Sequence, residues 1–177
     1  MALLGAAVAQ ELVGAQISGQ PTMLMSDGAV SLCGLRIIAA AQGRGQDFDF
    51  ADVSINLTDT GVGMVKAGAG SVTSAELKGG TRSFTPIDAI WLRVEGGKDI
   101  RPLDGKLYPG QGKHMVVYGA DPELVVGAVA ATLQGRPVQI YIKHAGDQNG
   151  RILFGSMKAT PGEYAQAASC MKDLVAR

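Results

Sequence analysis

The sequence has few cysteines, few aromatic residues and no concentration of charge. Its 177 residues include 2 cysteines, 2 histidines and 1 tryptophan, and basic and acidic residues number 16 each. The chain has no basic run or arginine stripe, which disfavours nucleic acid and acidic membrane surfaces as partners. No segment has the roughly 20 consecutive apolar residues of a membrane-spanning helix, so we expect no membrane span. A chain of this length can bury about 70% of its unfolded surface in one domain.

Motifs of nucleotide binding and of catalysis are also missing. The glycines at Gly61, Gly63, Gly68 and Gly70 match neither the phosphate-binding loop nor the dinucleotide fingerprint. No GxSxG sequence presents a serine nucleophile. Cys170 falls in the body of a predicted helix, away from the helix N-terminus where thiolates are stabilised. The sequence therefore predicts no cofactor and no catalytic group, and it favours a protein that is not an enzyme.

The two cysteines, Cys33 and Cys170, lie near opposite ends of the chain and outside any metal-ligand spacing. A disulfide between them would close a loop of more than roughly a hundred residues, which the chain-entropy model values at about 4 to 5 kcal/mol. It would tie an early strand to the last helix. Two unrelated buried thiols are the alternative.

Residues 1–9 form a short apolar run that ends in Ala7-Val8-Ala9. This pattern is typical of the hydrophobic region and cleavage site of a secretory signal, although the positively charged start is missing. We interpret 1–9 as a possible remnant of such a signal, and an ordinary apolar helix is the alternative. Because disulfides persist in oxidising compartments, the cysteines and this run together predict a periplasmic or extracellular location.

The clearest secondary-structure signals lie in residues 113–177. Asp121 and Pro122 follow a short apolar run and are typical of a helix N-cap and first turn, and Gly135 suits the end of that helix. Alternation over 138–143, a turn at 145–150 and an apolar run over 152–157 predict a hairpin. Thr160 and Glu163 form a capping box that begins a terminal helix. The predicted buried stripes are Val126, Val129, Ala130 and Leu133 in the first helix, and Tyr164, Ala167, Ala168, Met171, Leu174 and Val175 in the second.

The earlier part of the chain reads as strands joined by short turns. Ser26-Asp27-Gly28 marks a turn, Gly34 is a possible bulge in the strand that follows it, and 86–95 is the clearest strand. Glycine and small polar residues dominate 66–83, which predicts a loop with at most a short strand around Val72.

These elements predict an α+β fold. We expect an antiparallel β-sheet or β-sandwich of about seven or eight strands with two helices near the C-terminus packed on it, and 10–177 as a single globular domain. Over residues 124–174, the order of helix, glycine and hydrophobic strand, glycine turn, strand and capped helix resembles the end of several small periplasmic β-sandwich proteins. Because these motifs are generic and cover a minor part of the chain, the resemblance implies no function.

Trp91, Arg93 and Tyr141 form the first candidate site. They lie on the faces of their strands opposite the aliphatic stripes, and their residue types are enriched in binding hot spots. If the two strands share a sheet, the three side chains form one binding patch. The alternative is that a helix or a second sheet covers them.

The only histidines, His114 and His144, form a second and weaker candidate. They lie at the start of one predicted strand and the end of another, so they would be adjacent if those strands pair. With Asp147 they would offer three ligands to zinc, which binds three or four. The alternative is that they are polar residues at strand ends and that no metal is bound.

Together these observations predict an exported bacterial binding or interaction module, braced by a Cys33–Cys170 disulfide, whose ligand is an unidentified protein or small molecule. One alternative is a hydrolase-like enzyme with a site under the 66–83 loop, which requires a cleft with convergent polar groups. The other is a cytoplasmic or virion structural subunit, in which case the cysteines are free.

Overall fold

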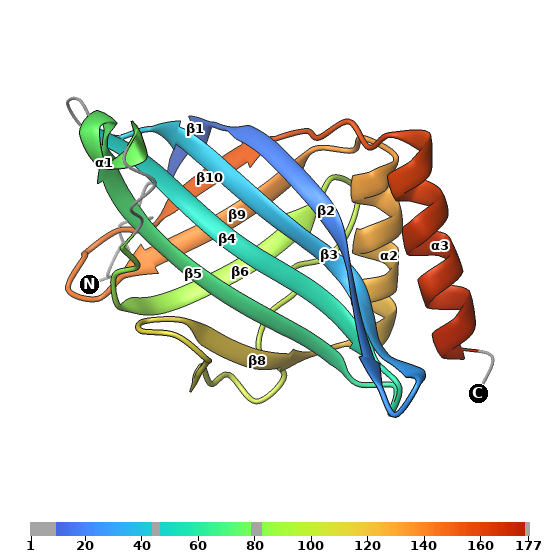
Figure 1. Cartoon of the computed structure of the whole chain (residues 1–177). Coiled ribbons are helices and arrows are strands. Elements are labelled where there is room, and N and C mark those ends of the chain that lie inside the picture. The colour runs from blue at the N-terminus through green and yellow to red at the C-terminus, as the bar shows by residue number, and fades with distance from the viewer. Residues whose placement is uncertain (1–9, 44–46, 79–82, 176–177) are drawn as a thin grey trace, which may run out of the picture.

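Two β-sheets pack face to face, and two helices lie side by side at one end of the pair (Figure 1). The structure is a computed structural model that describes residues 10–43, 47–78 and 83–175. The predicted signal remnant at 1–9 lies outside the described residues. Within them, no helix has both the length and the apolar character needed to cross a membrane.

The first sheet has six strands in the order β2-β3-β4-β5-β8-β7, all antiparallel. The second has four strands in the order β1-β10-β9-β6, with β1 parallel to β10 and the other pairs antiparallel. The strands are β1 (Glu11–Gly14), β2 (Gln16–Ser26), β3 (Ala29–Gln42), β4 (Asp47–Thr58), β5 (Gly63–Thr73), β6 (Ile87–Val94), β7 (Tyr108–Pro109), β8 (Val116–Ala120), β9 (Val138–His144) and β10 (Arg151–Gly155), and the helices are α1 (Ser74–Lys78), α2 (Pro122–Leu133) and α3 (Pro161–Val175).

This architecture confirms the predicted α+β sandwich, although the described residues contain ten strands rather than seven or eight. The additional strands come from regions with weak sequence signals. Residues 10–20 carry no hydrophobic period, yet they form β1 and the start of β2. β1 belongs to the four-stranded sheet and β2 to the six-stranded sheet, so the chain crosses between the sheets here. Pairing with β10 and β3 supplies the order that local propensity does not.

The core lies between the two sheets and continues beneath the helices. In β3 and β4 alternate side chains such as Leu35, Ile37, Val53 and Ile55 are buried, which is the period-2 pattern of a strand with one face covered. The four-stranded sheet covers one end of this face, whereas α2 and α3 cover the other end (Figure 1). The core is therefore covered by the four-stranded sheet at one end and by helices at the other.

The loop predicted over 66–83 is wrong over 66–78, because β5 continues to Thr73 and α1 follows it, and residues 79–82 lie outside the described residues. The small residues of β5 have a packing role instead. A Cβ on Gly68 would overlap the sulfur of Met115 and would lie 2.7 Å from the ring of Phe84, so glycine lets these side chains lie flat on the strand.

The bulge predicted at Gly34 is also wrong, since this residue is in regular register with Thr22 and Asn56. The irregularity in this hairpin falls between Leu24 and Met25. Glycine occupies position 34 because the neighbouring strand approaches closely: an added Cβ would overlap the carbonyl oxygen of Ile55 and the side chain of Asn56.

Both C-terminal helices begin where predicted. Asp121 caps α2 by accepting a hydrogen bond from the backbone N–H of Glu123 at 2.9 Å, and Gly135, with a φ of 82°, follows the end of that helix. At the start of α3, the Glu163 carboxylate accepts from the Thr160 backbone N–H at 2.7 Å, and Thr160 Oγ1 accepts from the Glu163 N–H at 3.2 Å. This reciprocal pair is the predicted capping box.

The predicted buried face of α2 is partly wrong. Val126 and Ala130 are exposed, because α2 is apolar nearly all round and its hydrophobic period alone does not select a face. Packing against β4, β5 and β6 selects it instead. The buried residues are Val125, Ala128, Val129, Thr132 and Leu133.

The α3 face differs from the prediction in a similar way. Ala167 and Leu174 are buried as predicted, whereas Tyr164 and Ala168 are exposed, and the side chain of Val175 is outside the described residues. Cys170 determines this orientation, because its bond to β3 turns the side of the helix that carries it towards the sheet.

The predicted disulfide is present. Cys33 of β3 and Cys170 of α3 are bonded with their Cα atoms 5.8 Å apart, and both cysteines are buried. They form a small cluster with Val30, Leu57 and Leu174, separate from the main core. Because the bond closes a loop across 137 positions of sequence, the chain-entropy model values its effect on the unfolded state at about 4 to 5 kcal/mol.

The close approach at Gly34 leads to a first prediction. Gly34→Ala should lower the free energy of unfolding by about 3 kcal/mol, at the upper end of typical overpacking costs, because the new methyl group would separate β3 from β4. Gly119→Ala is the matched control in β8, since a Cβ there meets no atom within 4 Å. Urea denaturation of both variants measures the difference. Equal stability of the two would contradict the close packing at Gly34.

Candidate functional site

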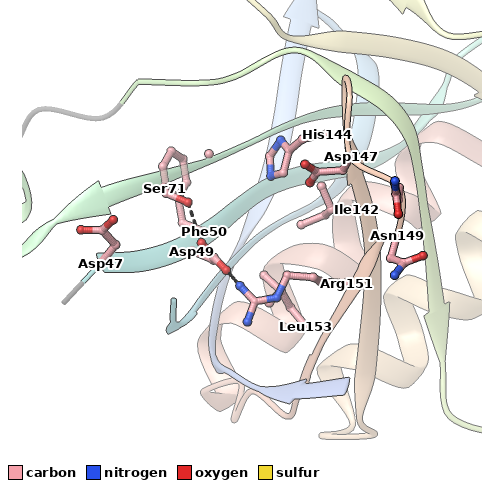
Figure 2. A pocket seen from close by; sticks show the side chains of 12 residues that line it. Asp47, Asp49, Phe50, Ser71, Ile142, His144, Asp147, Asn149, Arg151 and Leu153 are labelled. Carbon is pink, nitrogen blue, oxygen red and sulfur yellow. Dashed lines mark hydrogen bonds and ion pairs between the residues drawn. The ribbon is translucent and has the colours of Figure 1, made fainter. Parts of the chain in front are cut away.

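A polar cavity lies between the sheets at the end of the sandwich opposite α2 and α3; we call it the mouth. Its volume is about 350 Å³, and side chains of β4, β5, β9 and β10 converge on it (Figure 2). The lining residues are Asp47, Asp49, Phe50, Gly70, Ser71, Ile142, His144, Asp147, Gln148, Asn149, Arg151 and Leu153.

The mouth forms where the inward-facing positions of the strands change from apolar to polar. Asp49 continues the face of β4 that buries Ala51 and Val53, and His144 continues the face of β9 that buries Ile140 and Ile142. The strands therefore aim charged and polar groups into the space that is apolar core elsewhere.

Arg151 is held between two carboxylates. Its Nη1 forms an ion pair with Asp49 of β4, and its Nε lies 3.0 Å from Oε2 of Glu11. The parallel pairing of β1 with β10 places Glu11 directly beside Arg151. Ser71 of β5 donates a hydrogen bond to the Asp49 carboxylate at 2.6 Å. Residues of four strands thus hold one another in place on one side of the mouth.

On the other side of the mouth, His144 has a defined hydrogen-bond partner. Its Nδ1 lies 2.8 Å from Oγ1 of Thr85, and the Thr85 hydroxyl is 3.3 Å from the Ala69 carbonyl oxygen, to which it donates. Because the hydroxyl has a single proton, both bonds form together only if His144 Nδ1 carries a proton and donates to Thr85. In the neutral imidazole, this assignment leaves the lone pair on Nε2.

The three weak candidates for zinc ligands, His114, His144 and Asp147, do not all come together. His114 precedes β8 in the six-stranded sheet, whereas His144 ends β9 in the four-stranded sheet, so their strands do not pair. His144 and Asp147 both line the mouth. In the parts of the chain that the structure describes, no group of three His, Cys, Asp or Glu side chains is suited to hold a metal ion.

The binding patch predicted at Trp91, Arg93 and Tyr141 lies on the outer face of the four-stranded sheet. Trp91 of β6 is paired with Tyr141 of β9, and their rings stack at 5.2 Å between centroids and 8° between planes. The two strands do share a sheet, as the predicted patch requires. Trp91 is only 9% exposed, however, because Arg93 and Arg101 lie over it, 5.5 and 5.3 Å from the ring centroid.

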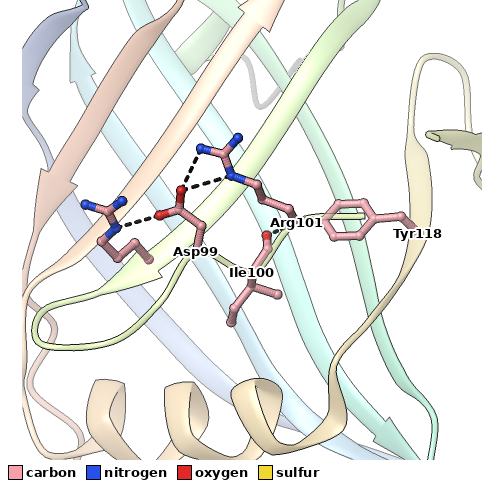
Figure 3. A network of polar contacts seen from close by, with 5 residues as sticks. Asp99, Ile100, Arg101 and Tyr118 are labelled. Carbon is pink, nitrogen blue, oxygen red and sulfur yellow. Dashed lines mark hydrogen bonds and ion pairs between the residues drawn. The ribbon is translucent and has the colours of Figure 1, made fainter. Parts of the chain in front are cut away.

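One carboxylate holds both guanidinium groups (Figure 3). Oδ1 of Asp99 accepts from Arg93 Nε at 2.5 Å, and Oδ2 accepts from Arg101 Nε and Nη2 at 2.9 and 2.6 Å. We call Trp91, Tyr141, Arg93, Asp99 and Arg101 the Trp91 cluster. Partial burial opposes ionisation of Asp99, but the hydrogen bonds from Arg93 and Arg101 outweigh it and hold the pKa of Asp99 below its usual range.

Tyr118 supports the cluster from inside the core. Its hydroxyl donates to the carbonyl oxygen of Ile100 at 3.1 Å (Figure 3). Burial raises the pKa of Tyr118 far above its usual range. Ile100 also bridges to Leu92 of β6. Residues 99–101 are therefore held along β6 by the backbone of Ile100. Ile100 itself is buried, and Asp99 and Arg101 lie on the outer face of the sheet (Figure 3).

Some residues of the two sites were not predicted from the sequence, and a local sequence pattern points to only two of them. Asp47 and Asp49 alternate with Phe48 and Phe50, which places both carboxylates in phase with the buried side chains of β4. Asp99 and Arg101 flank an isolated apolar residue within a charged connection, and that pattern is too short to identify a strand. The mutual positions of Ser71, Arg151 and Glu11 depend on strand pairing and have no local signal.

Comparison of the chain with protein-family models, with curated proteins and with solved structures gives no match. The function is therefore inferred from the geometry of these two sites.

The lowered pKa of Asp99 predicts a pH dependence of stability. Since the pKa is lower in the folded state, the stabilisation from Asp99 is present above the unfolded value of about 3.9 and is lost as the pH falls through the folded value. Asp99→Asn removes this titration. Urea denaturation should therefore show a gap in stability between wild type and variant at pH 7 that narrows below about pH 4. A gap of constant size across this range would contradict the ion-pair assignment.

Proposed function

We propose that the protein is an exported binding module whose ligand is a small polar molecule held in the mouth. The observation that carries this proposal is the change of the inward-facing strand positions from apolar to polar around a cavity of about 350 Å³. This volume is within the range of small-molecule sites, which combine apolar walls with a few convergent polar groups. Phe50, Ile142 and Leu153 supply the apolar walls.

Stability alone does not account for the polar groups of the mouth. The Asp49 and Arg151 side chains are 16% and 21% exposed, so both lose most of their hydration. An ion pair at such a depth is often no more stabilising than apolar side chains of the same volume. Polar groups that face inwards at one end of an otherwise apolar core are expected where a ligand binds.

The chemistry of the mouth favours a ligand with several hydrogen-bond donors. The carboxylates of Asp47 and Asp147 and the Nε2 lone pair of His144 are acceptors, and the amides of Gln148 and Asn149 can either donate or accept. A small molecule with several hydroxyl or amine groups would satisfy these acceptors. The proposal identifies this class of ligand rather than one compound.

Binding is favoured over the hydrolase-like alternative by the contacts of Ser71, the serine that lines the mouth. Ser71 donates to the carboxylate of Asp49, whereas His144 Nδ1 is engaged with Thr85. A serine nucleophile requires its hydroxyl to be bonded to a general base such as histidine. Among the described residues, no hydrogen bond joins Ser71 to His144.

The disulfide supports the exported location and contradicts one premise of the structural-subunit alternative, in which the cysteines would be free. The bridge is buried and joins distant parts of the chain, as expected of a structural disulfide in an oxidising compartment.

Export leads to a measurement on the native protein. Protein purified from the cells that produce it should contain no thiol that reacts with an alkylating agent, and it should gain two alkyl groups only after reduction. Intact mass spectrometry, with alkylation before and after reduction, gives the result. Two alkylated cysteines in the unreduced native protein would contradict export.

Ligand binding in the mouth is tested by a thermal-shift screen of sugars, polyols, amines and amino acids. Compounds that stabilise the wild type should lose part of their shift with Asp147→Ala and with His144→Ala. A hydrogen bond to a charged group such as Asp147 contributes about 1.5 to 3 kcal/mol, and one to a neutral imidazole about 0.5 to 1.5 kcal/mol. Asp173→Ala is the matched control, because Asp173 is an exposed carboxylate on α3 at the other end of the molecule.

Two results would contradict the proposed ligand site. One is that no compound of these classes changes the melting temperature of the wild type. The other is that the shifts are the same in the two mouth variants as in Asp173→Ala, which would place binding elsewhere on the protein.

A further inference from the structure

The outer face of the four-stranded sheet has an organised surface on the side opposite the mouth. Leu12, Ile152, Tyr141 and Trp91 are paired in sequence across β1, β10, β9 and β6, so their side chains form one apolar row over the sheet. Phe154 of β10 lies on the same face in the next row. At one end of the row, Leu12 and Phe154 meet solvent, with 58% and 37% of their surface exposed, whereas Ile152 is only 9% exposed.

The opposite end of the row is cationic. The Arg93 and Arg101 side chains are 44% and 60% exposed, and Lys143, next to Tyr141 on β9, occupies the adjacent outward position. Arg93 and Arg101 share the one carboxylate of Asp99, and Lys143 lies on the other side of the Trp91 and Tyr141 pair, next to Ala89 and the exposed Asp88 of β6. Beyond the end of β6, Glu95 and Lys98 in the following turn offset each other. The end of the row that carries the Trp91 cluster therefore has an excess of positive charge.

The two guanidinium groups are ordered before any partner binds. Trp91 supports them from beneath, Tyr141 supports Trp91, and Asp99 fixes both arginine Nε atoms. A free arginine side chain loses conformational entropy when a partner binds it. Arg93 and Arg101 are already ordered in the folded protein, so binding loses less entropy here. The Asp99 contacts use Nε of Arg93 and Nε and Nη2 of Arg101, which leaves further N–H groups of both guanidiniums for a partner.

We propose that this face docks an acidic segment of another protein, with carboxylates at Arg93 and Arg101 and apolar side chains along the row towards Phe154 and Leu12. Charge complementarity argues for carboxylates, which a guanidinium binds in a two-pronged geometry. The apolar row argues for a protein, since a simple anion would use only the cationic end. The interface does not depend on the ligand proposed for the mouth, because the inward and outward positions of β9 face opposite sides of the sheet.

A protein segment fits this face better than an anionic membrane does. The chain has equal numbers of basic and acidic residues, so its formal net charge of zero supplies no long-range attraction to an anionic surface. Trp91 is covered by two arginines, so it is not presented for insertion among lipid headgroups.

The single tryptophan makes the face directly observable. Trp91 is the only tryptophan of the chain, so its fluorescence reports on this cluster alone. The probe is a short peptide of glutamate and leucine, titrated into the full-length protein, with a second peptide that has glutamine in place of glutamate as its control. The acidic peptide should change the Trp91 emission in a saturable manner, and the glutamine peptide should bind at least about tenfold more weakly.

Two variants separate docking from a purely structural role of the cluster. Arg101→Gln should weaken binding of the acidic peptide by about tenfold, and Lys172→Gln on α3 should not change it although it removes the same charge. Arg101→Lys keeps the positive charge but loses the planar fork that Asp99 and Trp91 hold, so it should weaken binding less than Arg101→Gln does. A purely structural cluster would show changes in stability without this graded loss of affinity from Arg101→Lys to Arg101→Gln.

Several outcomes would overturn the proposal. No response of Trp91 to the acidic peptide at millimolar concentration would do so, as would equal affinity for the two peptides. Unchanged binding by Arg101→Gln would show that the positive charge is not what recognises the peptide. Phosphatidylglycerol vesicles that change the Trp91 emission in the absence of a response to peptide would assign the face to a membrane instead.

Discussion

The constraint on which the structure depends is the burial of one face of the long strands β2 to β5. These strands extend beyond the four-stranded sheet, so a single cover does not suffice, and the chain supplies α2 and α3 for the remainder (Figure 1). Apolar burial at about 25 cal/mol per Å² makes an uncovered aliphatic strand face costly. The order of elements in the second half of the chain meets this requirement.

The disulfide fixes α3 against the sheet, where the helix buries few side chains. Ala167, Cys170 and Leu174 are the described buried residues of α3, and two of them belong to the small cluster outside the main core. The covalent bond to Cys33 compensates for this limited contact, because it keeps α3 near β3 even when the helix separates from the sheet locally. It also determines which side of α3 faces inwards.

Both candidate sites arise at the limits of the same core. At the end of the sandwich away from α2 and α3 (Figure 1), inward positions of the strands are polar, and Asp49, Arg151 and His144 line a cavity instead of packing as core. On the outer face of the four-stranded sheet, the side chains that alternate with the core residues Ile90, Leu92 and Ile140 form the apolar row and the Trp91 cluster. Strand alternation therefore assigns each site to its side of the sheet.

The sequence by itself determined the elements whose information is local. The Asp121 cap, the Thr160 and Glu163 capping box and the alternation of β6 and β9 are interactions or patterns within a few residues, and all of them are present in the structure. The pairing of Trp91 with Tyr141 was conditional on a shared sheet, which the sequence did not show. Only the tertiary structure decided that β5 is a strand, that Arg101 covers Trp91, and that Arg151 lies between Glu11 and Asp49. The physical reason is that glycine-rich strands and charged connections have weak local preferences, so contacts between distant parts of the chain determine where they lie.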